Sequence, residues 1–339
     1  MVHSTQFRYA QIDSTHFNFN PVFKYVKKYL SSADFTMGNL ETVTAGKEIG
    51  WKGYPKFNTP DDFVTALKNA GFDVLFTANN HALDQGELGV ERTIKTIKKN
   101  GVENVGTYPK GKRNYLILYK NYIKIAILAY TYGTNGFSLP DSSRYAINVI
   151  RRKKLRKDLL NVRKEENPDL TIVYFHFGDE YNREPSDFQL DYVNYAFRYG
   201  ADIILGSHPH VIQPVVFWKN KKNFTGRFVA YSLGNFISNQ TWRYSDCGVI
   251  MNFIITKNFK KDSLYLKKIN FLPTWVYKGL DSVGKNSYYI LPATLVFKDS
   301  LPAFITPEDK KRFIESINDT KEKINEKGAS IPLTDISVR

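Results

Sequence analysis

The chain has 339 residues, 42% apolar and 15% aromatic, enough to bury a large core. Lys and Arg number 48 against 33 Asp and Glu, so a net charge of +15 should attract nucleic acid, an anionic polymer or a membrane surface. The single Cys247 excludes an internal disulfide framework and a cysteine-based zinc cage. No apolar run approaches the ~20 residues that cross a bilayer, so we expect a soluble chain.

Helix and strand patterns alternate through the first two thirds of the chain, which predicts an α/β protein. The spacing of apolar residues and the capping signals predict helices over residues 21–30, 60–70, 88–99 and 185–199. Short apolar runs predict strands over residues 73–76, 171–175 and 202–205, and a hairpin over 115–119 and 123–130.

The pattern changes to consecutive strands after His210, over residues 211–218, 227–231, 248–256 and 264–271. This late run favours two stacked sheets over one parallel sheet. From Thr306 a charged amphipathic helix is expected to about residue 326, followed by a polar tail. We therefore expect a main domain over residues 1–275 and a C-terminal extension over 276–339.

Four of the six histidines lie in three short polar segments, each directly after an apolar run. The segments contain Asn80 with His81, then His176, and finally the pair His208 and His210. A lone histidine is more often a structural residue. However, the carboxyl ends of strands in an α/β sheet meet at one edge, so four in this position favour one site. Imidazole is a common metal ligand and a general acid or base near neutral pH.

Other polar residues keep a plain structural reading beside a functional one. Asn235 lies in YSLGNF, which either forms a turn or lines the site, and Glu180 follows His176 in a loop where it could orient a ligand or contact substrate. Asp84 and Gly86 are expected to start the helix after His81. His3 could be a ligand. The basic run at residues 151–157 is more often a solvated helix face than a binding site.

Five ordered motifs carry a resemblance to a known family. GNLET at 38–42, NNHALDQG at 79–86, HFGDEY at 176–181, GADIILGSHPHVIQP at 200–214 and YSLGNF at 231–236 closely resemble the poly-γ-glutamate capsule synthesis family, known as CapA or PGA_cap. The resemblance runs from about residue 1 to 274. It implies a calcineurin-like metallophosphoesterase fold, with two stacked mixed β-sheets flanked by helices.

The resemblance also implies roles for individual residues. Asn80, His176, His208 and His210 match metal ligands of the phosphoesterase pattern, and His81 matches the general acid that protonates the leaving oxygen. The implied cofactor is a divalent ion such as Mn, Fe or Zn, because no cysteine lies in these motifs.

Two departures from the family pattern affect this site. The bridging Asp of the phosphoesterases is replaced by Asn39, although Glu41 could supply a hard oxygen ligand instead. The usual first strand ending in Gly-Asp does not precede residue 1, so we expect an incomplete site that binds metal weakly. In the family that upstream region often carries a membrane anchor, which would place the full-length protein at the extracellular face of the membrane.

The leading hypothesis is a metal-binding, hydrolase-like protein of a capsule or cell-envelope system that handles poly-γ-glutamate or a similar polymer. Asn39, Glu180 and Asn235 would contact substrate or support the ligands. The rival is a non-catalytic subunit that binds polymer or contacts the membrane subunits of a capsule synthase complex. A phosphodiesterase acting on nucleic acid is the weakest reading, because no nucleic-acid recognition motif is present.

Overall fold

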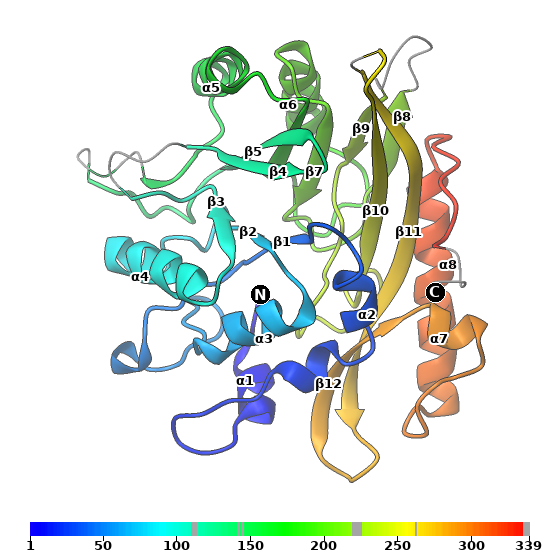
Figure 1. Ribbon diagram of the computed structural model, residues 1–339. Helices are drawn as coiled ribbons and strands as arrows, with labels where there is room; N and C mark the ends of the chain where they lie inside the picture. Colours follow the sequence, from blue (N-terminus) through cyan, green and yellow to red (C-terminus); the bar gives the residue numbers. More distant parts are fainter. Residues whose placement is uncertain (110–113, 141–142, 144–145, 219–225, 262, 335–339) are drawn as a thin grey trace.

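The computed structural model describes residues 1–339 apart from 110–113, 141–142, 144–145, 219–225, 262 and 335–339. Its described strands form three sheets (Figure 1). The smallest is parallel, in the order β1 (Met37–Asn39), β2 (Val74–Phe76), β3 (Glu103–Val105). Strand β1 lies at an edge of this sheet. The strand that was expected before residue 1 stays a prediction.

The largest sheet has six strands and is mixed. Its order is β4 (Leu116–Lys120), β5 (Ile123–Thr131), β6 (Leu170–His176), β7 (Ile203–Ser207), β9 (Arg227–Ala230), β8 (Val215–Trp218). The four central strands are parallel, while β4 and β8 pair antiparallel at the two edges. The predicted hairpin and each of the strands predicted before and after the histidine segments are confirmed, although β8 begins later than expected.

The third sheet is antiparallel and consists of β10 (Cys247–Asn258), β11 (Ser263–Leu280) and β12 (Asn286–Pro292). It confirms the expected strand-rich final third. The domain boundary expected after residue 275 falls inside β11, whose partner β12 belongs to the proposed extension. The division into two units therefore stays a prediction.

One apolar core joins the sheets and explains why they stack. Phe76 of β2 lies face to face with Tyr174 of β6 at 4.2 Å between ring centroids. The same core includes Ile172 of β6, Phe228 of β9 and Phe271 of β11, all buried. The mixed α/β architecture with stacked sheets is confirmed, because each sheet buries one face against another.

The helices cover the remaining faces. Figure 1 shows α8 along the outside of β11 and α5 with α6 beside the six-stranded sheet. Leu155, Leu159 and Val162 of α5 pack in one cluster with Val173 and Phe175 of β6. The α-helices are α1 (Ser4–Ala10), α2 (Lys27–Leu30), α3 (Asp62–Ala70), α4 (Gly86–Lys99), α5 (Arg152–Glu166), α6 (Asp187–Arg198), α7 (Thr294–Phe297) and α8 (Pro307–Asn325). In the described part of the chain, no helix is long and apolar enough to cross a membrane.

Two helix predictions were wrong in detail. The single helix expected over residues 21–30 is a 3₁₀ turn, η1 (Asn20–Phe23), followed by the short α2; a second 3₁₀ turn is η2 (Lys47–Ile49). Aromatic and β-branched residues have a weak helix propensity. Phe23 and Val26 are both fully buried, so tertiary packing decides the shape of this segment. Helix α3 begins at Asp62, two residues later than expected, with Asp61 as its cap, and the Thr59 hydroxyl lies 2.7 Å from the Thr42 hydroxyl.

Candidate metal centre

The parallel strands bring the predicted histidines together. His176 is the last residue of β6 and pairs in register with Ser207, the last residue of β7, which directly precedes His208. His208 and His210 both have positive φ values, +107° and +58°. A left-handed backbone is costly for a residue with a Cβ and persists where the surrounding structure enforces it, often at functional sites.

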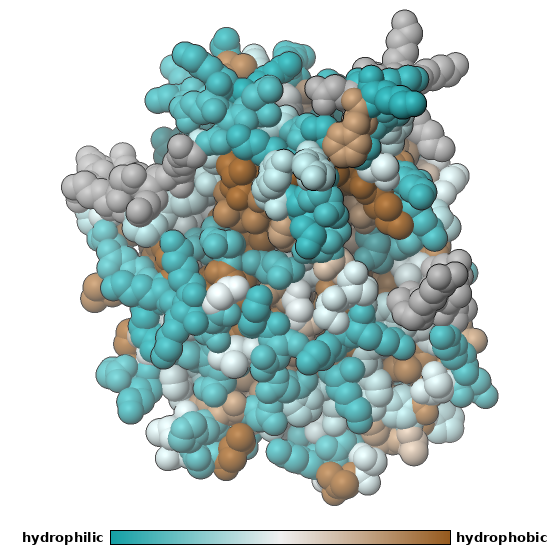
Figure 2. Space-filling model, in the orientation of Figure 1, coloured by the Kyte–Doolittle hydropathy of each residue, from teal (hydrophilic) through white to brown (hydrophobic). Residues whose placement is uncertain are grey.

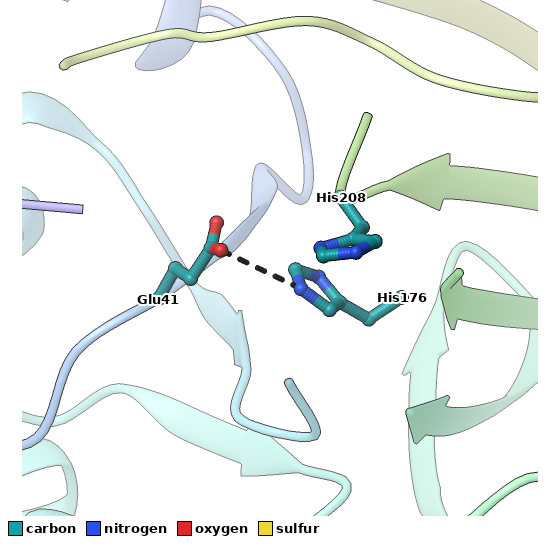
Figure 3. Close-up of side chains that lie close together, drawn as sticks. All are labelled: Glu41, His176 and His208. Carbon is teal, nitrogen blue, oxygen red and sulfur yellow. Dashed lines mark ion pairs between the residues drawn. The ribbon is translucent and has the colours of Figure 1, made fainter. Parts of the chain in front are cut away.

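Glu41, His176 and His208 form the central cluster. Their ligand atoms all lie within 4.8 Å of one another, and all three residues are buried. Figure 3 shows the Glu41 carboxylate directed at His176, with the His208 ring beside it; Glu41 Oε1 lies 3.5 Å from His176 Nε2. The same oxygen lies 3.9 Å from Nε2 of His210. Glu41 therefore lies among the predicted histidines, and its role as a metal ligand stays a prediction.

A second group of possible metal ligands shares His208 with the central cluster. Glu180, His208 and His210 also offer ligand atoms within 4.8 Å of one another, but Glu180 is exposed. The sequence predicted Glu180 only as a contact for substrate or a support for a ligand, so its position beside two histidines adds a second possible carboxylate ligand.

Three asparagines hold the centre in place. Asn80 Oδ1 lies 2.9 Å from His176 Nε2, and Asn39 donates from Nδ2 to Glu41 Oε2 at 3.2 Å. Asn235 Oδ1 lies 3.1 Å from His210 Nδ1, while its Nδ2 donates to Gln240 and to the Ser245 carbonyl. Asn80 thus sits among the predicted ligands, whereas Asn39 and Asn235 support ligands from outside.

Asp84 was assigned the wrong role from the sequence. Helix α4 begins at Gly86 with Gln85 as its cap, and Asp84 instead points back to His81, with Oδ2 2.8 Å from His81 Nδ1. The same oxygen accepts the backbone N–H of Phe57 at 2.7 Å. A carboxylate on Nδ1 fixes the ring and leaves Nε2 as the nitrogen that can exchange a proton. The His-x-x-Asp spacing was the available signal.

The electrostatics of the centre favour the forms that bind metal. Burial lowers the pKa of His176, and it lowers the pKa of His208 to about 3, so both rings are neutral at pH 7. Burial alone would raise the pKa of Glu41, but the neighbouring His176 and His210 outweigh it and hold the pKa well below its ordinary value. Neutral imidazole and ionised carboxylate are the states that bind a divalent ion.

Unsatisfied buried atoms show that this chemistry fits a cation. The buried side-chain atoms of the described residues that have no hydrogen-bond partner include Glu41 Oε1, His208 Nδ1 and His3 Nε2 at this centre, and others elsewhere in the molecule. Leaving such atoms unpaired is costly, and a cation would satisfy the first two. Burial also lowers the pKa of His3 to about 4, and Glu41, His81 and His210 are close enough to influence it electrostatically. His3 therefore belongs to this neighbourhood.

Two tyrosines near the centre were not predicted. The Tyr132 ring lies 4.6 Å from the His208 ring, and the Tyr181 ring lies 5.9 Å from that of His210. Both tyrosines remain partly exposed. Their positions depend on loop conformation after β5 and β6, so no sequence periodicity marks them.

The loops beside the centre are tied to helix α8. Lys323 pairs with Glu184 at 2.6 Å, in the loop that carries Glu180. Asp319 accepts two hydrogen bonds from Arg243, at 2.9 and 3.0 Å, in the loop after Asn235. The C-terminal helix therefore braces two loops that carry residues of the centre.

Comparison with known proteins gives the family. The model of the bacterial capsule synthesis protein PGA_cap matches residues 1–240, more than half of the chain. The chain belongs to this family. It is 30% identical over 247 residues to the capsule biosynthesis protein CapA of Bacillus anthracis, covering 70% of this chain and 58% of that protein. It is also 30% identical over 271 residues to the PGA biosynthesis protein CapA of Bacillus subtilis, covering 74% and 65%.

The chain thus spans about three fifths of the length of these relatives. Among solved structures, the calcineurin-like phosphoesterase YfkN of Bacillus subtilis is 13% identical, with a TM-score of 0.44 and 94% of each chain covered. The NAD nucleotidase of Haemophilus influenzae is 14% identical, with a TM-score of 0.45, covering 91% of this chain and 51% of that one. Similarities at this level assign no function.

Proposed function

We propose that this capsule-synthesis protein binds a divalent cation and uses it in the hydrolytic processing of an anionic envelope polymer, poly-γ-glutamate being the first candidate. The observation that carries the proposal is the buried cluster of Glu41, His176 and His208, whose ligand atoms lie within 4.8 Å of one another. Two of these residues keep buried atoms without a hydrogen-bond partner.

The ligand set supports Mn, Fe or Zn. Glu41 supplies oxygen, His176 and His208 supply nitrogen, and the Asn80 carboxamide oxygen lies beside His176. Nitrogen and oxygen ligands without sulfur suit these ions. When bound, such an ion polarises an acyl or phosphoryl oxygen and lowers the pKa of water. We expect weak binding, because the cluster contains a single buried carboxylate.

His81 is the proposed proton donor to the leaving group. Asp84 holds its Nδ1 side at 2.8 Å, and the Phe57 ring packs against it edge-on at 4.7 Å. This arrangement fixes the imidazole in one orientation with Nε2 free for proton transfer, as general acid catalysis requires. Asp84 acts through His81 and is a positioning residue.

The polymer and the location are inferred from the relatives and from charge. The named relatives serve capsule or PGA biosynthesis, and a net charge of +15 suits a polyanionic chain. We propose that the protein acts at the extracellular face of the membrane, beside the membrane subunits of a capsule synthase complex.

The test combines metal content with cleavage. The purified protein is loaded with Mn²⁺, Fe²⁺ or Zn²⁺, its metal content is measured by elemental analysis, and poly-γ-glutamate chain length and bis-p-nitrophenyl phosphate hydrolysis are followed. We expect bound metal and metal-dependent cleavage of one substrate, with both lost in Glu41→Gln and retained in His16→Gln. His16 is an exposed histidine paired with Asp13, so it serves as a matched control. Absence of bound metal in the wild-type protein would overturn the proposal.

One observation favours a non-catalytic alternative. Asn39 occupies the place of the bridging Asp and donates a hydrogen bond to Glu41, so it brings no charge for a second cation. A single cation could then serve only to hold the polymer. Metal-dependent polymer binding without cleavage, with Asp84→Asn behaving as wild type, would select this alternative.

A further inference from the structure

Two hairpin turns meet at the end of the molecule that lies away from the metal centre. The turn between β4 and β5 lies just before Ile125, and Ile125 pairs with Leu170, the first residue of β6. His176 of the metal centre is the last residue of β6, so the turn and the centre lie at opposite ends of this strand. The seven residues of β6 span about 20 Å. Strand β10 likewise leaves the centre at Cys247, whose carbonyl accepts the Asn235 N–H, and reaches its turn at Asn258.

Exposed aromatic rings occupy both turns. Tyr122 and Phe259 are each 67% exposed, and their rings contact each other edge-on at 5.6 Å. Tyr119 is exposed nearby on β4. In Figure 2, the upper part of the visible face, over the ends of β10 and β11, carries apolar side chains among hydrophilic ones. Large aromatic rings left in contact with water at two adjoining turns mark an interaction surface.

The backbone of the first turn adds a second observation. Asn121 and Tyr122 have φ values of +50° and +62°, as a two-residue type I′ hairpin requires. Asn and Gly adopt this conformation easily, but an aromatic residue does so at a cost. Neither burial nor the turn itself explains Tyr122, because a small residue would serve the hairpin better.

Exposed lysines lie next to these rings in the sequence. Lys120, Lys260 and Lys261 lie within two residues of Tyr122 or Phe259 and are exposed. Lys120 lies 3.5 Å from Asp34, a pair between exposed groups that holds the charge weakly. Within the part of the chain that the structure describes, no ion pair involves Lys260 or Lys261. We call these lysines with Tyr119, Tyr122 and Phe259 the paired tip.

We propose that the paired tip docks on the surface of a lipid bilayer that contains anionic lipid. Aromatic rings gain free energy in the headgroup region of a bilayer, where lysines meet lipid phosphates. Poly-γ-glutamate would engage the lysines but has no aromatic group to stack on the rings, so the combination favours a membrane over that polymer. Docked in this way, the protein would hold its metal centre on the side away from the lipid. The proposal does not depend on the activity of that centre.

The test uses sedimentation with vesicles of phosphatidylcholine alone and of phosphatidylcholine mixed with phosphatidylglycerol. The wild-type protein should bind the mixed vesicles, with affinity falling as salt is added, because exposed charges are screened within about 10 Å at 0.1 M. Tyr122→Asn with Phe259→Ser should lower the partition coefficient by about tenfold. Lys260→Ser with Lys261→Ser should lower it by roughly tenfold or more at low salt.

The β11–β12 turn supplies a matched control at the opposite end of the molecule (Figure 1). Leu280 and Val283 are exposed there in another hairpin, so Leu280→Ser with Val283→Ser should bind as wild type does. In Phe259→Trp, the emission should shift to the blue on mixed vesicles and be quenched by brominated lipid. Equal binding to both vesicle types would overturn the proposal. So would loss of binding in the lysine variant only, which would indicate a surface for soluble polyanions.

Discussion

The candidate metal centre and the apolar core beneath it share strand β6 but are built by opposite rules. In the core, Tyr174 stacks on Phe76 at 4.2 Å, and its hydroxyl reaches out to His176 Nδ1 at 3.1 Å. The centre begins two residues farther along the same strand. In it, Glu41 Oε1 and His208 Nδ1 are buried without hydrogen-bond partners. The core therefore supplies the stability that holds the centre in an arrangement that would be unfavourable by itself.

The largest effect on folding should come from the core. Phe76→Ala removes a buried ring that stacks on Tyr174, and we expect it to lower the free energy of unfolding by about 3–5 kcal/mol, measured by urea denaturation. The exposed Phe259 gives a matched control, and Phe259→Ala should change stability by less than about 0.5 kcal/mol. Similar losses in the two variants would contradict the division between core and surface.

A substitution in the centre should weaken metal binding without lowering the stability of the metal-free protein. Glu41→Gln should weaken Mn²⁺ binding by about 100-fold, or about 2.7 kcal/mol, in calorimetric titration. The metal-free variant should be as stable as wild type or more so, because a buried charge without a full partner is removed. Glu180→Gln separates the two ligand groups, and we expect a smaller loss because Glu180 is exposed. Metal-free Glu41→Gln as unstable as Phe76→Ala would show that Glu41 is structural.

The buried histidines should make the stability of the metal-free protein depend on pH. The folded-state pKa of His208 is lowered to about 3, below its unfolded value, so the unfolded state binds more protons between these values. Stability should therefore fall as the pH drops below about 6.5, by up to about 1.4 kcal/mol per pH unit for this group. His208→Gln should flatten the profile in urea denaturation, and His16→Gln should not. A profile unchanged by His208→Gln would contradict the burial of a neutral imidazole.

The smallest effect is expected at the brace formed by α8. Asp319→Asn weakens the two hydrogen bonds from Arg243 and should cost about 1 kcal/mol of stability. Asp299 pairs with Lys310 at 3.8 Å and is almost fully exposed, so Asp299→Asn should have no measurable effect on the melting temperature. Equal effects would show that α8 contributes nothing to the loops beside the centre through Asp319.

The convergence of the centre was predictable where strands deliver residues, and unpredictable where loops do. His176 and His208 follow apolar runs, and parallel register places the ends of β6 and β7 side by side. The His-x-x-Asp spacing was the one signal for the role of Asp84, whereas the position of Tyr132 depends on how a loop folds back, which no residue spacing specifies. The helix expected over residues 21–30 was misjudged for a related reason: tertiary packing of its aromatic residues decided its shape.

The most direct test of the central claim is anomalous diffraction from crystals grown with Mn²⁺, recorded near the manganese absorption edge. We predict a peak within about 2.0–2.6 Å of the Glu41 carboxylate and of a ring nitrogen of both His176 and His208. A peak bound by Glu180, His208 and His210 alone would move the site to the second group. Crystals without any peak at these residues, or with peaks only on surface carboxylates, would contradict the claim that this cluster is a metal centre.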